Sequence, residues 1–130
     1  MKTEELMIGD WVRVPSELNR EKQIRSTFDM DSAVLYEAIP LTPEILEKNG
    51  WVRTKYSYGR DCMEIHGADK LPEGVDNALS MARWSIDKNY QYHFLDLYMW
   101  KGGVMQHNVH YVHQLQHAFR IFGIEREIKL

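Results

Sequence analysis

The sequence is short of the residues that mark several classes of protein. Cysteine occurs once in 130 residues, which leaves no internal disulfide, and four prolines and eight glycines are too few for a collagenous or low-complexity chain. The longest apolar run, residues 94–100, contains Asp96 and falls far below the roughly 20 residues that cross a bilayer. The opening segment, 1–6, has no apolar signal core. These absences predict a cytoplasmic protein without membrane contact.

The chain also lacks a large excess of charge of either sign, and it lacks catalytic motifs. Sixteen basic residues face 19 acidic ones, so the net charge of −3 argues against a general nucleic-acid binder. The chain contains no Gly-rich phosphate loop, no paired-cysteine zinc spacing and no nucleophile elbow. We therefore expect no cofactor and a role that is not enzymatic.

The residues that are present indicate one folded domain spanning 1–130. The chain is 44% hydrophobic and 12% aromatic, and a domain of this length can bury a substantial core. Alternating apolar residues predict strands at 6–14, 33–38, 51–58, 61–66, 90–100 and 104–109. Segment 75–86 fits a helical face, whereas 82–87 fits a strand, which we favour. Segment 90–100 is apolar on both faces, which predicts an interior strand covered on both sides.

Two helices complete the predicted α+β fold. The segment 42–50 has a threonine N-cap, proline at the first helical position and a terminal glycine. The segment 110–122 ends before Gly123, and 125–130 forms a short strand or tail. One side of this C-terminal helix carries Tyr111, Val112, Leu115, Ala118, Phe119 and Phe122. The histidines occupy the opposite side, so we expect them to face away from the core.

Three stretches of the chain carry more specific patterns. They are the Ile-Gly opening at 6–12, the helix start 39–46 (Ile-Pro-Leu-Thr-Pro-Glu-Ile-Leu) with Asn-Gly-Trp at 49–51, and Tyr-Val-His-Gln-Leu-Gln at 111–116 with a Gly-x-x-x-Glu tail at 123–127. Together they resemble a group of small uncharacterised proteins from Bacteroides-group gut bacteria and their phages and prophages. The resemblance covers roughly a quarter to a third of the chain and is weak over 53–105. It implies a shared fold with a partly barrel-like sheet and transfers no catalytic residue.

Histidines near the C-terminus are candidate metal ligands. His107, His110, His113 and His117 follow one another at short intervals, and the last three share a helical face. Imidazoles one turn apart can bind one transition-metal ion. No carboxylate or cysteine completes the set on that face, where Arg120 adds a repelling charge. The alternative is a polar face in contact with solvent, a partner subunit or backbone groups.

Cys62, Glu64 and His66 alternate along one predicted strand and therefore project to one face. A thiol, a carboxylate and an imidazole can form a nucleophile with its base, or three metal ligands. Residues two apart on a strand lie about 6–7 Å from one another, so their side chains do not normally meet. We favour a half-exposed hairpin strand whose Met63 and Ile65 are buried, and we assign no catalytic residue.

A basic and aromatic stretch is the candidate nucleic-acid site. Its members are Arg53, Lys55, Tyr56, Tyr58 and Arg60. Basic groups hold phosphates and aromatic rings stack on single-stranded bases. The acidic residues Asp61 and Glu64 follow at once, and the alternative is a surface hairpin with its aromatic rings in the core.

These patterns favour a non-enzymatic binding or assembly module of phage-derived or mobile-element origin. A protein partner or self-association is expected, through the polar face of the C-terminal helix and the hairpin at 51–66. The first alternative is a nucleic-acid-binding accessory protein that uses the basic-aromatic hairpin. The second is a metal-dependent enzyme or sensor that uses the helical histidines.

Overall fold

The fold was obtained as a computed structural model that describes residues 1–55, 61–67, 73, 78–87, 92–124 and 126–130. Its strands are β1 (Trp11–Val14), β2 (Arg20–Gln23), β3 (Glu37–Ala38), β4 (Val52–Lys55), β5 (Asp61–His66), β6 (Leu79–Asp87), β7 (Tyr92–Met99) and β8 (Val104–Asn108). The helices are α1 (Thr27–Met30), α2 (Pro43–Lys48) and α3 (Val112–Ile121), with 3-10 helices at Thr3–Glu5, Pro15–Glu17 and Ala33–Leu35. The predicted α+β class is confirmed.

The larger sheet is an antiparallel meander in the order β4-β5-β6-β7-β8. The hairpin predicted from 51–66 is confirmed over β4 and β5, whose register pairs Thr54 with Cys62. The ambiguous segment is a strand from Leu79 to Asp87, and 74–77 lies outside the described residues. The strand after the Gly102-Gly103 turn pairs back on β7 as predicted, with Leu97 opposite Met105.

The smaller sheet, order β2-β1-β3, departs from the predicted strands. β1 begins only at Trp11, because Gly9, at φ +98°, bends the chain before it and Ile8 is 54% exposed. The strand predicted at 33–38 is wrong over its first half, where a 3-10 helix occupies Ala33–Leu35. Ala33 and Tyr36 are the buried positions there, and a spacing of three matches three residues per turn.

Both predicted helices form. Thr42 caps α2 by accepting a hydrogen bond from the backbone N–H of Ile45 at 3.2 Å. In α3, the Gln114 carboxamide accepts from the backbone N–H groups of His110 and Tyr111, which fixes the start of that helix. The C-terminal residues follow as a tail with no strand in its described part, in which Ile128 is buried.

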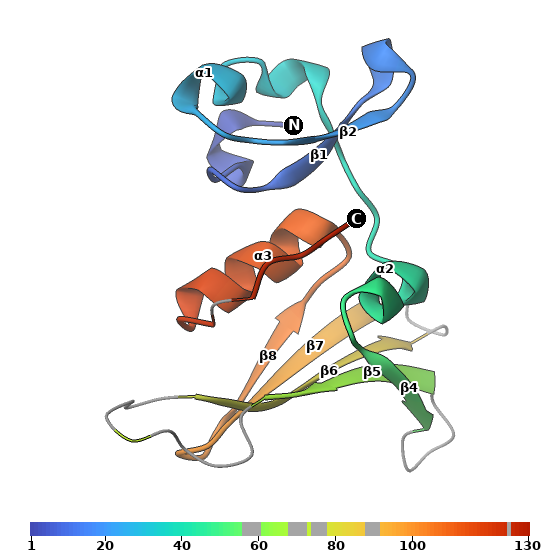
Figure 1. Cartoon of the computed structure of the whole chain (residues 1–130), viewed down its shortest axis with the longest axis vertical. Coiled ribbons are helices and arrows are strands. Elements are labelled where there is room, and N and C mark those ends of the chain that lie inside the picture. The colour runs from blue at the N-terminus through green and yellow to red at the C-terminus, as the bar shows by residue number, and fades with distance from the viewer. Residues whose placement is uncertain (56–60, 68–72, 74–77, 88–91, 125) are drawn as a thin grey trace.

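The molecule has three layers, with α3 in the middle (Figure 1). Helices α2 and α3 cover one face of the five-stranded sheet, and the smaller sheet lies on the other side of α3. The main core joins α3 to this sheet and includes Trp51, Trp84, Leu95, Leu97, Leu115 and Phe119. A separate core in the smaller layer contains Leu6, Val12, Val14, Ile24, Ala33 and Tyr36. The sheets do not close into a barrel in the described part of the chain.

β7 is an interior strand of the sheet, but the expectation that both its faces are covered is wrong. Leu95 and Leu97 are fully buried on the helix side. On the opposite side Phe94 and Tyr98 are half-buried and Tyr92 is 48% exposed. No described helix or strand packs against this second face (Figure 1).

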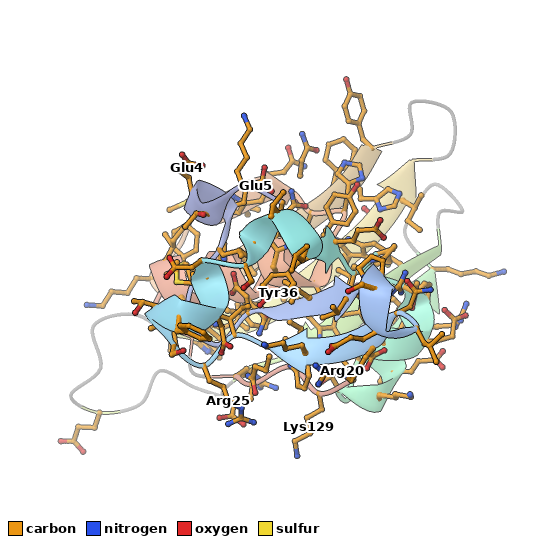
Figure 2. The ribbon with its side chains drawn as sticks, turned by 90° about the horizontal axis from the view of Figure 1, so that it is seen from above. Glu4, Glu5, Arg20, Arg25, Tyr36 and Lys129 are labelled. Atoms are coloured by element: carbon orange, nitrogen blue, oxygen red, sulfur yellow. The ribbon has the colours of Figure 1, made fainter. Side chains whose placement is uncertain are left out.

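Seen from above, the smaller sheet and its short helices cover α3 (Figure 2). Tyr36 lies near the middle of this layer, with Glu4 and Glu5 toward one side and Arg20 and Arg25 toward the other. The upper surface thus carries charges of both signs, as a solvated surface normally does.

Candidate functional site

The polar face of α3 is buried, which corrects the prediction that its histidines face away from packed elements. His113 is 6% and Gln116 7% exposed, and His117 is half-buried. The reason is the second sheet, which packs on the side of α3 that faces away from the first (Figure 1). A helical pattern reveals one apolar face, but it does not reveal a polar face that a second layer covers.

Asp10 lies at the contact between the smaller sheet and α3. Its carboxylate is fully buried and accepts hydrogen bonds from the backbone N–H of Met7 at 2.8 Å and from Arg120 Nη1 at 3.0 Å. His117 Nε2 lies 2.6 Å from Asp10 Oδ2, the oxygen that also accepts from Met7, whereas Arg120 binds Oδ1. A buried carboxylate needs such partners because its desolvation is costly. The arrangement resembles half of a catalytic triad, yet the described contacts of His117 include no hydroxyl or thiol nucleophile.

Gln116 adds a second polar link between α3 and β1. Its carboxamide accepts from the backbone N–H of Trp11 at 2.9 Å and donates to the Gly9 carbonyl at 2.8 Å. Gln23 of β2 donates to the same carbonyl at 3.0 Å. The Trp11 indole donates to the carbonyl of Ile128, which ties the C-terminal tail to β1. These contacts make the polar face of α3 a structural joint.

A pocket of about 720 Å³ lies beside this joint, where the smaller sheet, α3 and the tail meet. It is lined by Gly9, Gln23, Gln116, Phe119, Arg120, Gly123, Ile124, Arg126, Glu127 and Ile128. Its volume falls in the range of small-molecule sites. Arg120 is paired with Asp10, and the lining includes Glu127 as well as Arg126, so the pocket carries charges of both signs.

The interior position of His113 changes its titration. Burial, and next to it the nearby His117, lower the pKa of His113, while Asp10 and Glu5 act in the opposite direction. Its ring stacks on Tyr111 at 5.9 Å, and its Nδ1 has no hydrogen-bond partner among the described residues. His113 is therefore a neutral packing residue near pH 7.

The remaining histidines are divided between the sheet and the chain before α3. His110 lies 4.5 Å from His93, ring centre to ring centre, and burial together with His110 lowers the pKa of His93. His107 packs on Phe122 at 5.5 Å instead. Within the described ranges, no three or more His, Cys, Asp or Glu side chains are grouped so that they could hold a metal ion.

The Cys62 strand has the arrangement that we favoured, with Met63 and Ile65 buried on the opposite face. Cys62 is itself buried, and its Sγ lies 3.0 Å from Thr54 Oγ1 and 3.9 Å from Glu64 Oε1. His66 is exposed at the end of β5. Sγ is thus next to a hydroxyl and a carboxylate, and the imidazole is not part of this contact.

The candidate nucleic-acid residues are only partly described. Arg53 binds Glu47 at 2.6 Å and Glu44 at 3.6 Å, so its charge is used to hold α2 against β4. Lys55 is exposed at the end of β4. Tyr56, Tyr58 and Arg60 lie outside the described residues.

The uncovered face of the five-stranded sheet, which we call the outer face, gathers aromatic and apolar side chains from different strands. The antiparallel register places Tyr98 between Met81 and Val104, and Phe94 between Ser85 and Asn108. Tyr92 and Phe94 contact each other with ring centres 5.7 Å apart. Val104 is 53% exposed. The outer face therefore carries aromatic and apolar side chains next to polar ones such as Ser85 and Asn108.

A row of charges crosses the middle of the outer face. The register aligns Glu64, Arg83 and Asp96 on neighbouring strands. Arg83 Nε binds Glu64 at 2.7 Å, and its guanidinium lies over the Tyr98 ring. Partial burial opposes the charge of Arg83, but the bond to Glu64 and its attraction raise the pKa of Arg83 overall. The structure gives Asp96 no hydrogen-bond or ion-pair partner in the part that it describes.

Sequence patterns missed Asp10 and the charge row. Asp10 follows Gly9 at the start of a hydrophobic strand, which is an unusual place for a solvated acid. Arg83 and Asp96 interrupt apolar strands at positions that share a face only once the register is known. An isolated charged residue within an apolar strand was thus the sequence signal that could have indicated these positions.

No family model, curated protein or solved structure matches the chain. Across the described residues, no helix combines the length and the apolar character needed to cross a membrane.

Proposed function

We propose that the chain is a non-enzymatic protein-binding or assembly module, and that the outer face holds its partner. The observation that carries this proposal is the row of half-buried and exposed aromatic residues on a sheet face that no described element covers. Exposed apolar side chains grouped beside polar residues are typical of interaction sites. Tyrosine is enriched at protein interfaces because it combines an apolar ring with a hydrogen-bonding tip.

The charges on the outer face define the chemistry of the partner. Glu64 is already bound to Arg83, which leaves Asp96 as the carboxylate of the row without a described partner. Asp96 lies between Phe94 and Tyr98 along β7. The best complement is therefore a protein segment that places a basic side chain on Asp96 and apolar side chains on either side of it.

Protein binding ranks ahead of the two other roles. The cationic group of Arg53 is occupied by two carboxylates, which weakens the case for phosphate contact along the hairpin. His117 lies against Asp10, His113 is buried and His110 packs on His93, which weakens the case for a metal. A phage-derived origin is supported by the resemblance of the three sequence stretches, and a cytoplasmic location by the single, buried cysteine.

A displayed library of random peptides, selected on the full-length protein, tests the proposed function. We expect enriched peptides that combine a basic residue with aromatic or aliphatic ones. Tyr92→Ser and Asp96→Asn should each weaken a selected peptide about tenfold, since central interface residues carry most of the binding energy. Isothermal titration calorimetry measures this change.

The matched control is Phe28→Ser, which truncates another exposed aromatic residue, 79% exposed on α1. It should leave peptide affinity unchanged. The proposal is overturned if no peptide is enriched. It is also overturned if Phe28→Ser weakens binding while the two outer-face substitutions do not.

A further inference from the structure

β8 differs from the other edge strands of the molecule in having no protective charge. Edge strands expose unpaired backbone groups, and proteins normally guard them with charged residues, proline or bulges. β4, the opposite edge of the same sheet, carries Arg53 and Lys55. β2 carries Arg20, Glu21 and Lys22, and β3 is two residues long. β8 reads Val-Met-Gln-His-Asn and contains no Lys, Arg, Asp, Glu or Pro.

The side chains of β8 are also unusually open for an apolar strand. Val104 is 53% and Met105 44% exposed, although they project to opposite faces of the sheet. Among the described strands, β8 pairs with β7 on one side only and is the last strand of the sheet. Its free edge lies on the side away from β4 (Figure 1).

We propose that β8 pairs antiparallel with β8 of a second copy of this chain across a two-fold axis at Gln106. Such pairing places Val104 opposite Asn108 and Met105 opposite His107, so no residue of fixed charge meets a like charge. The pattern is therefore compatible with a two-fold interface, in which the same strand faces its own copy. A five-residue strand of this kind supplies both partners with the missing ladder of hydrogen bonds.

The paired strands join two five-stranded sheets into one continuous sheet. The outer faces of both copies then lie side by side. Val104 of each copy, which neighbours Tyr98, lies close to the paired β8 strands. The pairing itself follows from β8 alone. Only the use of the joined surface to bind a partner rests on the proposed function.

Charge substitution at Gln106 tests the pairing, because this exposed side chain would face its own copy. Light scattering and sedimentation across a concentration series should give the wild-type protein twice its 15.4 kDa chain mass. Gln106→Lys and Gln106→Glu should each weaken the dimer roughly tenfold, because like charges directly opposite one another destabilise a strand pair. An equimolar mixture of the two variants should recover the dimer.

Val52→Lys is the matched control, because Val52 is 63% exposed on the opposite edge strand. It should leave the dimer intact. A monomeric wild-type protein overturns the pairing, as does a dimer that resists both Gln106 substitutions or is dissociated by Val52→Lys. Binding of selected peptides to a monomer would retain the proposed function and remove only the pairing, whereas a dimer that selects no peptide would do the reverse.

Discussion

Asp10 joins the segment before β1 to α3 through its buried carboxylate. Its fully buried carboxylate joins the turn at Met7 to His117 and Arg120 of α3. Gly9 contributes by its size, because a Cβ there would lie 2.6 Å from Arg120 Nη2. A single carboxylate thus links a bent segment before β1 to a helix more than 100 positions away.

Asp10→Ala should lower the free energy of unfolding by about 2 kcal/mol, because it leaves the partly buried Met7 N–H and a partly buried guanidinium without their acceptor. Arg120 is 32% exposed and regains some water, which keeps the loss below that of a fully buried pair. Urea denaturation measures the change. Asp31→Ala, at an exposed position, is the control and should cost less than about 0.5 kcal/mol. Equal losses for the two variants would contradict the role of Asp10.

At the scale of elements, local signals predicted most of the secondary structure. The threonine cap of α2 and the alternation in β6 and β7 depend only on residues close in the sequence, and the structure confirms both. The layer on top of α3 was not predicted, because its contact is made by Gln116 and His117, which look like solvated residues in sequence. The 3-10 helix at Ala33–Leu35 was missed because a short apolar run has no distinctive period.

The buried position of His113 on α3 makes the stability of the protein depend on pH. Burial and His117 hold the pKa of His113 below its ordinary value of 6.5, so the unfolded chain takes up the proton at a higher pH than the folded one. The contribution is therefore complete above pH 6.5 and is lost as the pH falls from 6.5 toward the folded pKa. His93, whose pKa is also lowered, acts in the same direction.

His113→Phe removes this titration and keeps an aromatic ring beside Tyr111. Urea midpoints measured between neutral and mildly acidic pH should fall less steeply for this variant than for the wild-type protein. His66→Phe, at an exposed histidine, should keep the wild-type slope. Identical slopes for all three proteins would show that His113 does not contribute.

At the scale of the whole molecule, two separate cores share one helix. The smaller core has only six buried residues and belongs to a segment too short to fold alone without support. Its attachment to α3 runs through polar bonds, with Trp11 as its partly buried apolar link to the main core. Such a joint depends on pairing between distant residues, which explains why the sequence pattern predicted neither the second layer nor the histidine packing.

Because polar bonds hold the smaller sheet to α3, we expect the smaller sheet to unfold locally before the larger one. Gln116→Ala removes the bonds to Trp11 N–H and the Gly9 carbonyl, so amides of β1 and β2 should exchange about tenfold faster while those of β6 and β7 keep their rates. Hydrogen exchange followed by NMR measures both sets. Gln114→Ala, which alters the start of α3 without touching β1, should not accelerate β1 relative to β6. Equal acceleration of every strand by Gln116→Ala would mean that both sheets unfold as one cooperative unit.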